Sequence, residues 1–246
     1  MIPRRNRIRV QWHRWCLVGA LFCTTALEAE SLDSIDSLSQ EQFVLLSRVI
    51  SAATHYKSIA PAEGLGSLGL DAGIVYSSTE INQAVFDSAS SGSFENSELH
   101  QPRVHVHKGL PWGLDIGASV SKLHNTDLSV IGGELQYNLI QGGIVSPSLA
   151  IRASYSQLQG ITDLDLNSSA IELTVSKGFL MLTPYAGIGL VRTRSTPADG
   201  SELQAATFNQ EKLYAGVTMN LGLAITLEAD QTGDFRTYSA KAGIRF

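Results

Sequence analysis

The sequence predicts an all-β protein: a closed, antiparallel, up-and-down transmembrane β-barrel of about ten strands. Three observations support this fold class. The N-terminus is rich in arginine and then apolar, which is typical of an exported chain. From residue 67 onward, apolar side chains alternate with small or polar ones at a period of two, and the chain ends on Phe246 within such a segment. A signal peptide and a short amphipathic helix are expected before the barrel.

Residues 1–29 are expected to be a secretory signal peptide. Five arginines within residues 4–14 form a basic region, and residues 15–26 form an apolar stretch that is too short to span a membrane. Small residues follow, so cleavage is expected near Ala26 or Ala29.

Removal of this segment makes the mature chain strongly acidic. The 18 basic and 23 acidic residues become 13 and 22, because five arginines and Glu28 are lost, and the formal charge becomes −9. Nucleic-acid binding is not expected, since it requires a basic surface. Both cysteines, Cys16 and Cys23, lie in the signal peptide, so the mature chain is expected to have no thiol or disulfide.

Residues 30–66 are expected to form a periplasmic segment with one amphipathic helix, over about residues 39–55. Phe43, Leu46 and Ile50 lie at helical spacing, and Ser39 with Gln42 could form a capping box. We expect this helix at the periplasmic mouth of the barrel or on the membrane surface. A plug inside the lumen is the alternative, which we disfavour because side chains largely fill the interior of so small a barrel.

Residues 67–246 are expected to form the barrel. The face opposite the apolar side chains is rich in Gly and Ser with single charges at intervals, which favours a narrow barrel interior over the polar outer face of a soluble β-sandwich. Ten strands are predicted, over 67–77, 101–108, 112–123, 128–140, 147–157, 166–177, 180–192, 206–219, 221–230 and 235–246.

The connections between these strands predict the orientation. Short turns and longer polar loops broadly alternate, and bacterial barrels have short periplasmic turns and longer outer loops. An even strand number places both ends of the barrel in the periplasm. The connection 78–100 is long enough to contain a further hairpin, which leaves twelve strands as the alternative.

The last strand, TYSAKAGIRF, carries a resemblance at the level of a protein class. With Tyr238, Ile244 and Phe246 on one face, it resembles the terminal strand by which bacterial outer-membrane β-barrel proteins are handed to their assembly machinery. PYAGIGLV (184–191) resembles strands of OmpA-like and porin-like barrels, and residues 61–77 resemble the start of the barrel in uncharacterised proteobacterial outer-membrane proteins. The resemblance implies an outer-membrane location, with outer-membrane lipid and the barrel assembly machinery as partners.

The polar face of the strands predicts a lumen with balanced charges. The expected acids are Asp71, Asp115, Glu134, Glu172 and Glu228, and the expected bases are Arg103, Arg152, Lys212, Lys241 and Arg245. Counting from the strand ends places Glu134, Arg152 and Glu172 at one height, so we predict that they form one cluster. Lys241 and Asp71 are expected at a similar height on the two strands that close the ring.

No metal, cofactor or enzymatic activity is expected. His105 and His107 point the same way on one strand, but spacing fixes no third ligand and Arg103 lies beside them, so they are only weak metal candidates. His124-Asn125-Thr126 is a poor match to the His-x-Ser arrangement of phospholipase-like and lipid A deacylase-like barrels. We expect a structural or surface-interaction barrel with a charge-filled lumen, and the alternative is porin-like passage of small solutes or ions.

Overall fold

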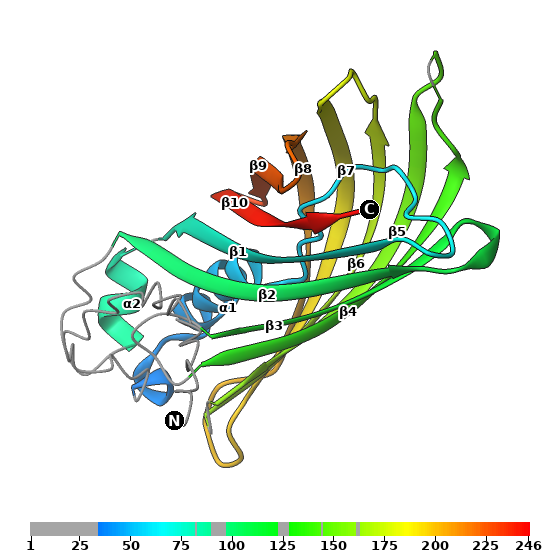
Figure 1. Cartoon of the computed structure of the whole chain (residues 1–246). Coiled ribbons are helices and arrows are strands. Elements are labelled where there is room, and N and C mark those ends of the chain that lie inside the picture. The colour runs from blue at the N-terminus through cyan, green and yellow to red at the C-terminus, as the bar shows by residue number, and fades with distance from the viewer. Residues whose placement is uncertain (1–33, 82, 90–96, 123–127, 144, 161–162) are drawn as a thin grey trace, which may run out of the picture.

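The structure is a computed structural model of the whole chain (Figure 1). It describes residues 34–81, 83–89, 97–122, 128–143, 145–160 and 163–246. The predicted signal peptide and its cleavage sites therefore lie outside the described residues. No helix among the described residues is both long enough and apolar enough to cross a membrane.

The chain forms one closed barrel of ten antiparallel strands, each paired with its neighbours in sequence, with β1 also paired to β10. The strands are β1 (Leu70–Glu80), β2 (Glu98–Gly109), β3 (Leu114–Lys122), β4 (Ser129–Ile140), β5 (Ser148–Gln159), β6 (Leu164–Ser176), β7 (Leu182–Pro197), β8 (Ala206–Asn220), β9 (Ala224–Thr232) and β10 (Phe235–Arg245). The predicted fold class is confirmed with ten strands. The twelve-strand alternative is wrong: the connection from β1 to β2 contains a helix, α2 (Gln83–Ala89).

The wall of the barrel is apolar outside and polar inside. Outward Ile74, Ile188 and Leu227 are 65%, 59% and 56% exposed, whereas inward Ser77 and Thr226 are buried. A closed sheet leaves no unpaired strand edge, and an apolar exterior suits hydrocarbon, so this wall is built to span a membrane. The protein is therefore a β-barrel of the outer-membrane class.

The C-terminal strand closes the ring, with the side chains on its outer face that the sequence predicts. Tyr238, Ile244 and Phe246 are exposed on the outer face. Phe246 exchanges two backbone hydrogen bonds with Leu70, of 2.8 and 3.0 Å, beyond the last residue of β10. The terminal residue therefore extends the pairing between the first and last strands.

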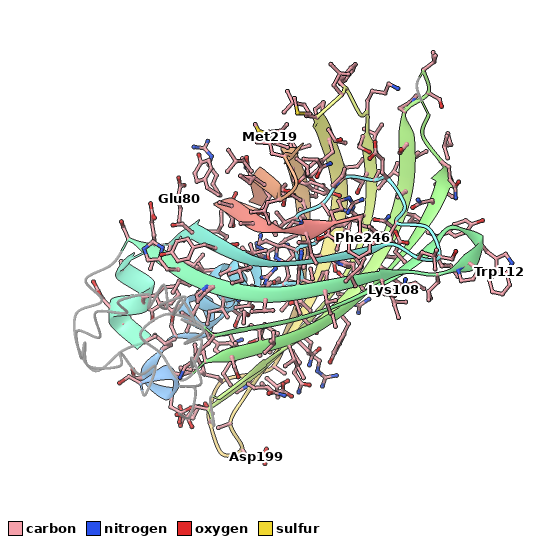
Figure 2. The ribbon with its side chains drawn as sticks, in the orientation of Figure 1. Glu80, Lys108, Trp112, Asp199, Met219 and Phe246 are labelled. Carbon is pink, nitrogen blue, oxygen red and sulfur yellow. The ribbon has the colours of Figure 1, made fainter. Side chains whose placement is uncertain are left out.

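The two ends of the barrel differ in their connections. At one end, which we name the turn rim, three to seven residues join β2 to β3, β4 to β5, β6 to β7 and β8 to β9; the first of these turns contains the 3-10 helix η2 (Pro111–Gly113). At the opposite end, the loop rim, lie the two longest connections, residues 81–97 and 198–205. Figure 2 shows Trp112 and Met219 at the turn rim and Glu80 and Asp199 at the loop rim. Because outer loops are the longer ones, we expect the loop rim to face outward.

Two helices precede the barrel: η1 (Ile35–Ser37), a 3-10 helix, and α1 (Gln40–Thr54). The predicted capping box is present, because the Ser39 hydroxyl accepts from the Gln42 backbone N–H (3.3 Å) and the Gln42 side chain accepts from the Ser39 N–H (2.9 Å). These bonds satisfy two of the groups that a helix N-terminus leaves without partners. The start of α1 therefore agrees with its sequence signature.

The expected position of α1 is wrong, because the helix lies inside the lumen (Figure 1). On one face, Ser47 Oγ lies 2.7 Å from Ser195 Oγ, and Ser51 Oγ lies 2.5 Å from Thr193 Oγ1, both on the inner side of β7. At the helix start, Gln40 exchanges two hydrogen bonds with Gln204 in the β7–β8 loop. The chain thus enters at the loop rim and descends to β1 at the turn rim. We name residues 34–63 the plug.

An adjacent apolar face of α1 seals the outer half of the lumen. Phe43, Leu46 and Ile50 are buried against α2 and against apolar side chains that the wall directs inward near the loop rim. The partners are Phe86 of α2 and Leu99, Leu128, Val130, Leu158, Leu164 and Leu166 of the wall. Apolar burial of this kind is the main favourable contribution to packing, so the outer end of the barrel contains its own hydrophobic core.

The reason for the wrong expectation is the small size of the inward side chains. A side chain at Gly117 would overlap the His107 ring and approach within 2.6 Å of the Tyr56 hydroxyl oxygen. A Cβ at Gly132 would lie 2.9 Å from the Tyr56 ring. The glycines of the polar face thus leave room for a second layer of chain, which a count of strands does not reveal.

The direction of the plug predicts which residues are accessible from outside the cell. Asp36 is exposed beside the loop rim, and Leu221 is 58% exposed in a turn at the opposite end. We expect a cysteine replacing Asp36 to react with a membrane-impermeant maleimide on intact cells, and one replacing Leu221 to react only after the outer membrane is opened. The reverse pattern would show that the loop rim faces the periplasm.

Candidate functional site

The second half of the plug, residues 55–62, runs through the lumen without regular secondary structure. Every one of these residues is buried, including the charged Lys57. Buried backbone carbonyl groups outside a helix or sheet need hydrogen-bond donors from elsewhere. The side chains on the inner face of the wall therefore determine whether this segment can be held in the lumen.

Three arginines of the wall supply these donors, and we name them the arginine clamp. They come from β2 and β10, which flank β1, and from β5 on another side of the ring. Their guanidinium groups donate to five plug carbonyls: Arg103 to His55 (3.4 Å) and Lys57 (3.2 Å), Arg152 to Ala60 and Pro61 (2.9 Å each), and Arg245 to Glu63 (2.6 Å). The clamp holds the plug backbone in place, and these contacts do not involve the plug side chains.

A buried ion pair also joins the plug to the wall. The Lys57 ammonium group lies 2.8 Å from both carboxylate oxygens of Asp230 on β9, and both side chains are fully buried. Thr232 donates to the same carboxylate (3.1 Å). A buried carboxylate is costly without a cation, so Asp230 depends on a charge that the wall does not provide at this point.

The neighbours of Lys57 in the plug bind the opposite side of the ring. The Tyr56 hydroxyl lies 2.8 Å from His107 Nε2 on β2, and the Ser58 hydroxyl donates to the Glu134 carboxylate on β4. Together with Lys57, these contacts connect three successive plug residues to β2, β4 and β9. The plug is therefore an integral part of the luminal hydrogen-bond network.

The other luminal acids are bound mainly by side chains of the wall. Asp71 on β1 receives Lys241 (3.1 Å) and Arg245 (2.7 Å), both on β10. The remaining predicted acids have these partners: Lys212 for Glu172 (2.8 Å), Tyr185 for Glu228 (2.6 Å), and both Gln136 (3.0 Å) and the Leu65 backbone N–H (3.2 Å) for Asp115. Each luminal acid named from the sequence thus has a hydrogen-bond donor.

The predicted cluster of Glu134, Arg152 and Glu172 is only partly what the structure contains. Arg152 on β5 is directly opposite Glu172 on β6. Glu134 on β4 is opposite Ser154, which is two residues further along β5. The Arg152 guanidinium donates to Gln136 (2.7 Å) and to the two plug carbonyls, while the two carboxylates have Ser58 and Lys212 as partners. The plug carbonyls are thus the acceptors of Arg152, and no direct ion pair between Arg152 and either carboxylate is present among the described residues.

The histidine pair has a neighbour that spacing did not identify. Asp71, His105 and His107 place one potential ligand atom each within 4.8 Å of one another. However, Lys241 and Arg245 already bind the Asp71 carboxylate, and His107 contacts Tyr56 and lies 3.4 Å from Glu134. Two cations on the only carboxylate of the group disfavour a metal ion, so the arrangement fits a charge network better.

The sequence identified most of the wall side chains of this site but not the plug residues that contact them. It named Arg103, Arg152 and Arg245 as luminal bases but not Lys57 or Asp230, which form the central ion pair. The available signal was the run HYKSIAPA after the helix, where one lysine stands among small and apolar residues. The segment 124–126, considered for catalysis, lies outside the described residues.

Comparisons with known proteins found matches among solved structures alone. No protein-family model and no curated protein matches the sequence. Among solved structures, Ail, the attachment invasion locus protein of Yersinia pestis, is 10% identical (TM-score 0.30), with 72% of this chain and 98% of that chain covered. The KdgM porin is 11% identical (TM-score 0.36), with 71% and 99% covered. The translocator domain of the autotransporter NalP from Neisseria meningitidis is 9% identical (TM-score 0.37), with 88% and 99% covered.

Replacement of Arg152 by Leu is expected to destabilise the barrel. It removes the donors of Gln136 and of two buried plug carbonyls, at a cost of about 2–4 kcal/mol, which lowers Tm by roughly 4–16 °C. Heat-modifiable gel mobility and thermal melting measure the effect. Arg236→Leu is the matched control, since Arg236 is exposed on the outer face of β10. Equal melting of the Arg152→Leu variant and the wild type would show that the clamp contributes nothing.

The ion pair between Lys57 and Asp230 is expected to show strong coupling. Lys57→Met and Asp230→Leu each leave one charge buried without its partner, at a cost of about 3–5 kcal/mol. The double variant leaves no unpaired charge. Its free energy of unfolding in phospholipid vesicles should therefore be higher than the value expected from the sum of the two single effects. Strict additivity in urea titrations would mean that the pair does not hold the plug to the wall.

Proposed function

We propose that this chain is a non-conducting outer-membrane barrel that acts through its outer face. The observation that supports the proposal most directly is that the plug fills the lumen along its length. The outer half contains the apolar core around α1, and the middle contains the clamped segment. Near the turn rim, Pro61, Glu63 and Asp115 line a cavity of about 10 Å³, which has room for about one water molecule.

Porin-like passage is the less favoured role for the same reason. A solute path would require the plug to leave, and this would remove the lysine partner of Asp230 and the carbonyl acceptors of the arginine clamp. Buried groups that lose their partners are costly. We assign no catalytic step to the lumen, where the acids are bound by donors of the plug or the wall.

The outer face is acidic, which indicates the kind of partner it suits. Exposed acids surround the loop rim on the plug, the loops and the strand ends: Asp36, Glu41, Glu80, Asp87, Glu98, Asp199, Glu202 and Asp234. These acids outnumber the exposed bases at the same end, Lys122, Arg194 and Arg236, and a net negative field favours association with a positive surface. We therefore infer that the partner of this face carries a basic surface and that its binding weakens with added salt.

Planar-bilayer recordings test the closed lumen. We expect the full mature chain to insert without producing stable conductance steps. A variant with Arg103→Gln and Arg152→Gln, which loses four of the plug carbonyl contacts, is expected to show intermittent openings. Heat-modifiable mobility of both proteins serves as the control for folding. Stable steps from the unaltered chain would overturn the proposal in favour of a porin-like role.

A further inference from the structure

The outer wall carries a groove of about 1120 Å³ that runs across β5 to β9. Its floor is apolar, formed by outward side chains such as Ile171, Leu190 and Leu213, which are 62%, 58% and 61% exposed. Its volume is slightly above the usual range for ligand pockets, about 300–1,000 Å³. In a membrane-spanning wall, such a groove lies among lipid acyl chains.

One end of the groove is polar, and this end lies toward the loop rim. The polar lining residues are Ser169, Arg192, Asn209, Glu211 and Gln231, from β6 to β9. The wall along β7 changes from apolar Ile188 and Leu190 to Arg192 and Arg194, all exposed on the same face. The change from an apolar floor to a polar end thus marks the boundary between hydrocarbon and head groups on the outer side of the membrane.

Two arginines at this boundary are available to a ligand: Arg192 lines the groove, and Arg194 lies two residues beyond it along β7, toward the loop rim. Among the described residues, neither guanidinium group takes part in a hydrogen bond or an ion pair. The residues directly opposite them are neutral and polar: Ser169 and Asn209 beside Arg192, and Asn167 and Thr207 beside Arg194. Glu211 is one step further along β8, opposite Leu190. Arginine binds phosphate with two parallel hydrogen bonds, so the pair is suited to a phosphate group.

The neighbours of the arginines suit a sugar rather than a simple phosphate ester. The Glu211 carboxylate and the Asn209 and Gln231 amides can accept hydrogen bonds from hydroxyl groups, and the Asn209 amide can also donate. The Gln231 amide and the Ser169 hydroxyl already donate to the carbonyls of Gly233 (3.2 Å) and Arg192 (3.5 Å). An acyl chain fits the apolar floor, a phosphate the arginines, and sugar hydroxyls the remaining polar groups. We propose that this groove binds an acylated lipid with a phosphorylated sugar head group from the outer leaflet.

Native mass spectrometry of the full mature chain in detergent tests this site. The probe is purified diphosphoryl lipid A, with the same lipid stripped of its phosphates as the matched ligand. We expect the double variant Arg192→Gln/Arg194→Gln to retain the phosphorylated lipid at least tenfold more weakly than the wild type. The control variant Arg236→Gln, which removes an exposed arginine of β10 outside the groove, is expected to retain it fully.

Three outcomes would overturn the site. Equal retention by the double variant and the wild type would show that the arginines do not hold the phosphate. Equal retention of the stripped lipid would show that acyl contacts alone account for binding. Displacement of the lipid by millimolar inorganic phosphate would identify a site for a free anion. The readout is independent of conductance, so failure here and failure of the closed-lumen proposal can be told apart.

Discussion

The structure depends on donors for the backbone carbonyls of a non-helical segment enclosed in a membrane barrel. A helix satisfies its own carbonyls, but residues 55–63 cannot, and they lie where bulk water does not reach them. The arginine clamp solves this problem with planar groups that donate along several directions from fixed positions on the wall. Without these three side chains, the plug would have to be helical throughout or absent.

The clamp also accounts for the charge composition of the lumen. A barrel whose acids and bases simply paired with one another would need equal numbers on neighbouring strands. Here two arginines, Arg103 and Arg152, direct their guanidinium groups to carbonyls, while Asp230 takes its cation from the plug. Plug and wall therefore form one electrostatic unit, and the luminal charges balance only when both are counted. This is the physical basis of the closed lumen that we propose.

The barrel could be predicted from the sequence because lipid imposes a simple rule on every strand. Outward positions such as Ile74, Ile188 and Leu227 must be apolar, so the period of two persists even where the inward residue is glycine. The same rule predicts which side chains of the last strand face inward, and hence that Lys241 lies near Asp71. The plug was placed wrongly because no such rule acts on it: α1 packs through hydroxyl groups and through apolar groups on adjacent faces, as a helix of a soluble protein could. The contacts of Lys57 depend on tertiary placement and leave no local pattern.

The ion pair between Lys57 and Asp230 has a consequence for how the molecule is made. The two residues are separated by 173 positions, and Asp71 is 170 positions from Lys241 across the closing seam. Contacts between such distant parts of a chain form late, because the ends of a long loop must first be brought together. The plug leaves the ribosome before any strand, yet its partner on β9 is among the last residues to follow. Enclosure of the plug and closure of the ring therefore take place in one step, because the plug is held only when the C-terminal strands complete the ring.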